Sequence, residues 1–208
     1  MLDLPSLAEL LLLLPAILIG LTFHEFAHGW MADRLGDHTA RHQGRLTLNP
    51  LAHIDPVGFL MLILFKFGWA KPVPVNPYNL RGDPARGMLL VSLAGPAANL
   101  VMALAASILL GVGLLRLVPF AEYVYYILYL TLQINVILAF FNLIPVPPLD
   151  GSKILAGLFP RQSHFIYGME TYGTIILLIL LFTGVLGKVL WPVVSFVVDM
   201  FLKISEII

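Results

Sequence analysis

Two histidines and a glutamate in the first apolar stretch have the residue types and the spacing of a zinc site. The sequence His24-Glu25-Phe-Ala-His28 places the two histidines four residues apart. On an α-helix such residues project from the same face one turn apart, so two imidazoles can share one metal ion. Glu25 lies beside the first histidine, where its carboxylate can act on a water molecule rather than bind the metal. The alternative is that the histidines only hydrogen-bond across helices, but this does not explain why all three residues occur at catalytic spacing.

A catalytic zinc site needs a third protein ligand. The chain has no cysteine, so this ligand must be a carboxylate, an imidazole or an amide. The candidates are Asp33, His38, His42, His53, Asp55, Asp150 and Glu170. Asp33 follows His28 on the same helix and is expected to point elsewhere. His53 and Asp55 remain possible, because the loop that carries them can fold back.

Asp150 is the ligand that we favour, because it ends the proline-rich segment Asn142-Leu-Ile-Pro-Val-Pro-Pro-Leu-Asp150-Gly151. This segment follows an apolar helix, and irregular backbone at membrane depth is tolerated only where it lines a cavity within the protein. Asp150 could instead form an Asp-Gly turn or cap a short helix. Asn142 could donate a hydrogen bond to a substrate carbonyl as it becomes an oxyanion, or simply end its helix.

The composition indicates that lipid surrounds the elements that position these residues. Apolar residues make up 59% of the 208-residue chain and charged residues 12%, and the mean hydropathy is +0.92. Soluble domains are about half apolar and a quarter charged. The formal net charge is zero and no Lys/Arg run is present, which argues against a nucleic-acid partner. Residues 1–10 carry Asp3 and Glu9 but no basic residue, so we expect a retained helix rather than a signal peptide.

Hydropathy predicts an all-α polytopic membrane protein with about five transmembrane helices and one half-span. A spanning helix needs roughly 20 apolar residues. The predicted spans are 7–31, 88–115, 121–141, 171–186 and 189–204. Residues 57–67 are apolar but too few to cross, residues 69–75 could form a short strand, and residues 152–159 a short helix. We expect one membrane domain over 1–208, with a catalytic core at about 7–160 and a C-terminal pair of spans at about 171–206.

The positive-inside rule supports this arrangement. If residues 57–67 only dip into the membrane, ten of the twelve Lys and Arg residues lie on the cytoplasmic side, whereas a full crossing removes the bias. The same topology places the end of the first helix and the segment 142–151 on one side. We therefore predict a multi-pass membrane protein with its active site toward the cytoplasmic face.

Together these motifs resemble the site-2 protease family of intramembrane metalloproteases (peptidase family M50). His24-Glu25-Phe-Ala-His28 and Asn142-x-x-Pro-x-Pro-x-x-Asp150-Gly151 carry the resemblance. The stretches 44–58 (GRLTLNPLAHIDPVG) and 95–99 (GPAAN) are similar to its compact prokaryotic branch without PDZ or CBS domain. The small residues of 95–99 are expected to allow close helix packing, and His53 and Asp55 to form a turn.

The resemblance implies one Zn²⁺ held by His24, His28 and Asp150, with Glu25 as general base and acid and Asn142 assisting at the substrate or oxyanion. It implies cleavage of a peptide bond within or near a transmembrane segment of a substrate protein, and a place in the cell (inner) membrane of a prokaryote. One alternative is a membrane zincin that cuts other peptides. A zinc transporter or sensor is a weaker alternative, because residues 88–115 contain no ionisable residue, whereas a transporter is expected to carry polar residues on several spans.

Overall fold

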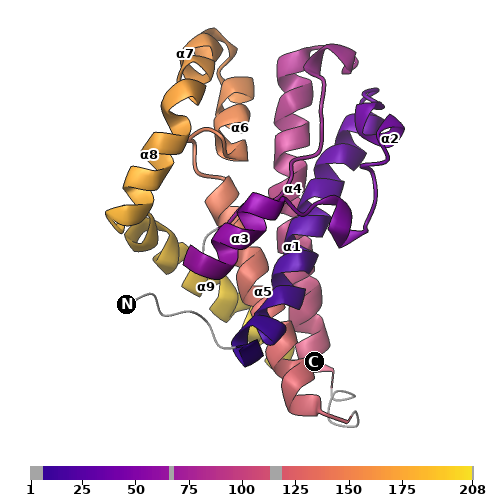
Figure 1. Ribbon diagram of the computed structural model, residues 1–208, viewed down its shortest axis with the longest axis vertical. Helices are drawn as coiled ribbons and strands as arrows, with labels where there is room; N and C mark the ends of the chain where they lie inside the picture. Colours follow the sequence, from indigo (N-terminus) through magenta and orange to yellow (C-terminus); the bar gives the residue numbers. More distant parts are fainter. Residues whose placement is uncertain (1–6, 66–67, 113–118, 208) are drawn as a thin grey trace.

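The computed structural model describes residues 7–65, 68–112 and 119–207, and these residues are helical with connecting loops (Figure 1). The long helices are α1 (Leu7–Arg34), α4 (Pro84–Gly111), α5 (Ala121–Asn142) and α9 (Val185–Ile207). The shorter helices are α2 (Thr39–His42), α3 (Pro56–Phe65), α6 (Asp150–Leu158), α7 (Ser163–Gly168) and α8 (Glu170–Phe182). The 3₁₀ turns are η1 (Pro50–Ala52), η2 (Pro77–Asn79) and η4 (Pro160–Gln162). The predicted all-α fold class is confirmed.

Four of the described helices are long and apolar enough to cross a membrane: 10–34, 84–111, 121–142 and 185–207. A fifth span results if residues 160–166 and 170–182, which are bent by 73°, are counted together. The predicted span 171–186 is shorter than expected, because α8 has 13 residues and ends before Gly184, whose φ is +72°. Glycine adopts this left-handed conformation without steric cost, so the chain turns there into α9. The predicted end of the second full span, residues 113–115, lies outside the described residues.

The predicted half-span, residues 57–67, corresponds over 57–65 to α3, a ten-residue helix that lies across the long helices in Figure 1, and residues 66–67 lie outside the described residues. At 1.5 Å per residue its length is about 15 Å, half of a bilayer core of about 30 Å. The segment 69–75 forms no strand within the described part of the chain. It is extended and joined to the preceding loop by one antiparallel bridge between Ile54 and Ala70, and by a hydrogen bond from Lys71 N to His53 O.

Helix α4 is the central element, since it contacts α1, α5, α6 and α9. Its buried positions recur every three or four residues and are mostly small, as in other close-packed membrane helices. They are Gly87, Val91, Ser92, Gly95, Pro96, Asn99, Ala103, Ala106 and Ser107. Toward its C-terminus α4 packs against α5 and α9 in an apolar cluster, whose members include Ala103, Leu132 and Val198. Toward its N-terminus the same helix faces the histidines of α1.

Candidate metal centre

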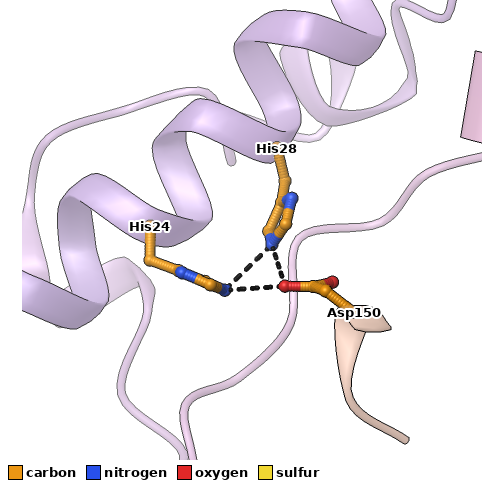
Figure 2. Close-up of side chains that lie close together, drawn as sticks. All are labelled: His24, His28 and Asp150. Carbon is orange, nitrogen blue, oxygen red and sulfur yellow. Dashed lines mark hydrogen bonds and ion pairs between the residues drawn. The ribbon is translucent and has the colours of Figure 1, made fainter. Parts of the chain in front are cut away.

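His24 and His28 lie on one face of α1, one helical turn apart, and both are buried, with 5% and 9% of their surface exposed. Their rings are 4.5 Å apart between centroids and perpendicular, so that both Nε2 atoms point to one place (Figure 2). The distance between the two Nε2 atoms is 3.0 Å. The arrangement expected from the four-residue spacing is therefore present in the structure.

Asp150 completes the cluster from the other end of the sequence. It is the first residue of α6, and its Oδ2 atom lies 3.2 Å from Nε2 of His24 and 3.2 Å from Nε2 of His28 (Figure 2). At a helix N-terminus the backbone dipole favours a negatively charged carboxylate. Within the described residues this is the one group of three His, Asp or Glu side chains close enough to hold a metal ion.

The three facing atoms fit a zinc ion by both distance and chemistry. Ligands about 2.0–2.1 Å from tetrahedral zinc lie about 3.3 Å from one another, and the cluster's edges measure 3.0, 3.2 and 3.2 Å. Oδ2 of Asp150 is buried and has no hydrogen-bond partner among the described residues. A buried carboxylate oxygen without a partner is costly, and a cation at the centre of the triangle would remove that cost.

The outer ring nitrogens of both histidines bond to α4. Nδ1 of His28 lies 2.7 Å from the carbonyl oxygen of Val91, and Nδ1 of His24 lies 2.7 Å from Oδ1 of Asn99. Both oxygens can only accept, so each Nδ1 carries the proton and donates it. Each Nε2 then presents a lone pair toward Asp150, as histidine ligands of metals do when their other nitrogen donates to protein.

Glu25 lies beside this triangle but is not part of it. Its carboxylate is largely buried, and its Oε2 accepts a hydrogen bond of 2.8 Å from the backbone N–H of Val73. Val73 belongs to the extended segment 69–75, which Arg45 holds through hydrogen bonds to the carbonyls of Lys71 and Pro72. The segment predicted as a possible strand thus fixes the orientation of Glu25.

All five predicted site residues line one cavity of about 630 Å³: His24, Glu25, His28, Asn142 and Asp150. Asn142 is the last residue of α5, and its Nδ2 donates to the carbonyl oxygen of Leu138 on the same helix. Its role in the reaction stays a prediction. Figure 2 shows Asp150 on a segment separate from the histidines. The cavity is lined by α1, α4, α6, the end of α5 and the segment 72–78.

The structure places the other candidate ligands elsewhere. Asp33 accepts hydrogen bonds from His38 and Arg41, away from the triangle as expected. Asp55 accepts the N–H of Gly58 at the start of α3, which fits the expected turn. Nε2 of His53 donates to the carbonyl of Thr47. Glu170 lines the metal cavity but is not one of the three clustered side chains.

Two residues of the GPAAN stretch contact the site directly, although the sequence indicated only close helix packing. A Cβ atom at Gly95 would lie 2.5 Å from Nε2 of His28 and 2.6 Å from Cε1 of His24, so only glycine leaves room for both rings. Asn99 bonds to His24 as described above. The available signal was a glycine and an asparagine, Gly95 and Asn99, four residues apart on an apolar span. The sequence did not indicate which residues they would contact.

Two metal-competent histidines and a carboxylate, set among membrane-length helices, define a membrane protein with a candidate zinc centre. The family profile described as "Peptidase family M50" matches residues 119–184. The chain is 38% identical to "Putative zinc metalloprotease YwhC" of Bacillus subtilis over 197 residues, which cover 92% of this chain and 90% of the relative. It is 34% identical to "Putative zinc metalloprotease Rip2" of Mycolicibacterium smegmatis over 91% of this chain and 73% of the relative.

A more distant relative is "Stage IV sporulation protein FB" of Bacillus subtilis, with 28% identity over 70% of this chain and half of the relative. No solved structure matches the chain. The near full-length similarity to YwhC shows that the chain belongs to peptidase family M50, the site-2 protease family of zinc metalloproteases. The resemblance seen in the sequence motifs is therefore confirmed, as is the expectation of a multi-pass membrane protein.

Proposed function

We propose that this chain is an intramembrane zinc metalloprotease that cleaves a peptide bond within or near a transmembrane segment of another protein. The observation that carries the proposal is the triangle of Nε2 of His24, Nε2 of His28 and Oδ2 of Asp150, with edges of 3.0–3.2 Å and a carboxylate oxygen without a hydrogen-bond partner. These three residues would hold one Zn²⁺, which supplies a Lewis acid for polarising a carbonyl and activating water.

Glu25 is the general base in this proposal, and later the acid that returns the proton to the leaving amine. The Val73 N–H holds Oε2 of its carboxylate beside the first histidine, at the wall of the metal cavity. Asn142 lines the same cavity and assists at the substrate carbonyl. For this role its Nδ2 would have to exchange the carbonyl of Leu138 for the substrate oxygen.

A second, apolar cavity of about 730 Å³ supports a transmembrane substrate. It is lined by α1, α3, α5 and the segments 50–55 and 68–70. Three of these walls, α1, α5 and the segment 68–70, continue directly into the metal cavity. The neighbouring wall residues of the apolar and the metal cavity are Thr22 and Glu25, Ala70 and Pro72, and Phe141 and Asn142. An apolar helix could approach Glu25 along these walls, and it must unwind locally to expose a carbonyl.

We further propose that the active site opens toward the cytoplasmic side of a bacterial cell membrane. The histidines lie in the C-terminal half of α1, and Arg34 ends that helix. Asp150 lies 3.2 Å from both histidines, which supports a common membrane side for the end of α1 and the start of α6. Water would then reach the metal cavity from the cytoplasm without crossing the apolar cavity.

The test uses the purified full-length chain in detergent micelles or nanodiscs, with metal content and cleavage of a model transmembrane substrate as readouts. Glu25→Gln is expected to retain zinc and lose cleavage, because the amide cannot take a proton. Asp150→Ala is expected to lose zinc and cleavage together. A soluble peptide with the same scissile sequence serves as the matched substrate.

The outcomes separate the alternatives. Full cleavage by Glu25→Gln would refute the general-base role. Equal cleavage of the soluble and the membrane substrate would favour a zincin without a requirement for a transmembrane segment. A wild-type protein that binds zinc but cuts neither substrate would favour a sensor or transporter.

A further inference from the structure

Asn99 is the one side chain of α4 that bonds to a candidate metal ligand, and it is completely buried. It makes three hydrogen bonds between α1, α4 and α5. Its Oδ1 faces Nδ1 of His24 at 2.7 Å, and its Nδ2 donates to the carbonyl oxygen of Gly20 and to Oδ1 of Asn135, both at 2.9 Å. Helix α1 is therefore linked to α5 through this amide, one turn before His24.

The orientation of this amide is fixed by backbone carbonyls, which can only accept hydrogen bonds. Nδ2 of Asn135 donates to the carbonyl of Thr131, so Oδ1 of Asn135 is the atom that faces Asn99. Asn99 must then present its Nδ2 to both Asn135 and the carbonyl of Gly20. A reversed Asn99 amide would bring its oxygen within 2.9 Å of two other oxygens.

A fixed amide has a direct consequence for His24. Oδ1 of Asn99 can only accept, so the proton of the neutral ring stays on Nδ1 and the lone pair of Nε2 points at Asp150. His28 obtains the same result from the backbone carbonyl of Val91, which no substitution can remove. The tautomer of His24 thus depends on the side chains of Asn99 and Asn135, both of which can be replaced by mutation.

We propose that Asn99 is a positioning residue for the metal centre, which selects the metal-binding tautomer of His24, and that Asn135 acts through Asn99 by fixing its orientation. The proposal rests on the metal site of the proposed function. The alternative is a purely structural role, in which the two asparagines only join three membrane helices through hydrogen bonds, as buried amides do. The two accounts differ in whether zinc affinity depends on Asn99.

The test measures zinc affinity of the metal-free full-length chain by competition with a chromogenic chelator, and the visible spectrum after loading with Co²⁺. Asn99→Leu is expected to weaken zinc binding by about 10–100-fold and to change the Co²⁺ spectrum, because loss of an outer hydrogen bond to a ligand has effects of this size. Asn135→Leu keeps the acceptor but frees the amide to turn, so a smaller loss is expected.

Asn99→Asp is the conservative variant. The carboxyl group keeps an oxygen that accepts the hydrogen bond from Nδ1 of His24, so its zinc affinity is expected to lie closer to wild type than that of Asn99→Leu. The matched control is Ser107→Ala, which removes another fully buried hydrogen bond of α4, to the carbonyl of Phe201, two turns from the site. It is expected to lower thermal stability and leave zinc affinity unchanged.

Wild-type zinc affinity in Asn99→Leu would overturn the proposal, as would an equal loss of affinity in Ser107→Ala. If Asn99→Leu does not fold, Asn135→Leu decides, since a wild-type zinc affinity and Co²⁺ spectrum in that variant would refute the proposed positioning through Asn135 and Asn99. A wild-type chain that binds no zinc would refute the metal centre itself. Zinc binding without cleavage would refute the protease and still leave the role of Asn99 decided by these affinities.

Discussion

Replacing Gly95 by alanine tests whether the space around the two histidines, rather than their identity alone, makes the metal centre. The new Cβ would lie 2.5 Å from Cε1 and Nε2 of His28 and 2.6 Å from Cε1 of His24. Ordinary contact begins at 3.4 Å, so the imidazoles must move by about 0.9 Å. Zinc–ligand distances vary by only about 0.2 Å, so such a shift cannot be absorbed by the coordination geometry.

The expected loss of zinc affinity is at least about 100-fold, which corresponds to about 2.7 kcal/mol. The metal-free protein should tolerate the change, because alanine favours a helix over glycine by up to about 1 kcal/mol and free imidazoles can turn away. Gly187→Ala is the control, since Gly187 also lies inside a helix and its Cβ would meet nothing within 4 Å.

The assay compares chelator competition for zinc with thermal unfolding of the metal-free protein. Gly95→Ala should lose zinc affinity without a matching fall in metal-free stability, and Gly187→Ala should keep both. Wild-type zinc affinity in Gly95→Ala would show that the rings do not occupy these positions when zinc is bound, and would refute the reasoning from the triangle.

Two further changes test the supports of the site. Gly151→Ala would place a Cβ against the backbone carbonyls of Leu143 and Ile144, which cannot turn away, so Asp150 would have to shift. Loss of zinc binding or of folded protein is therefore expected. A variant that still binds zinc and cleaves substrate would contradict this packing. Burial alone would raise the pKa of Asp37, but hydrogen bonds from Thr39, Asn76 and Asn79 hold that pKa below its ordinary value. The stability that Asp37 contributes is therefore present above about pH 4 and is lost as the pH falls through the lowered folded value. Thermal unfolding between pH 7 and pH 3 measures this effect. Asp37→Asn should be less stable than wild type at pH 7, and the difference in stability should shrink toward pH 3. A difference that stays constant over this range would exclude titration of Asp37 as the source of the effect.

The sequence was most informative where one helix or one short loop carries the signal. The i, i+4 spacing of His24 and His28 determines that they share a face, and the three prolines before Asp150 indicated an unwound segment at the membrane. Hydropathy located α1, α4, α5 and α9 because a long apolar helix has few other stable environments. It overestimated α8, where the change of direction depends on Gly184 and on packing with α9.

The supports of the ligands could not be predicted, because they arise from contacts between distant parts of the chain. Asn99 meets His24 across 75 residues of sequence, and Val73 meets Glu25 across 48. The GPAAN stretch predicted close packing, but nothing in its pattern specified that the partner would be an imidazole pair. The extended segment 69–75 had strand-like composition, yet Lys71 N and Val73 N bond to His53 O and Glu25, and the carbonyls of Lys71 and Pro72 to Arg45.

These contacts change which part of the chain determines metal binding. An HExxH helix alone leaves each imidazole free to choose its protonated nitrogen and to rotate, so it does not define a site. Helix α4 contributes none of the three clustered side chains, yet its Val91 carbonyl and Asn99 amide select the tautomers, and Gly95 sets the ring positions. Residues 88–115 carry no ionisable group, which weakened a transporter interpretation. The absence of charge on α4 beyond Arg86, in its first turn, is consistent with a helix that orients metal ligands through uncharged hydrogen bonds and close packing, at a depth where additional buried charge would be costly.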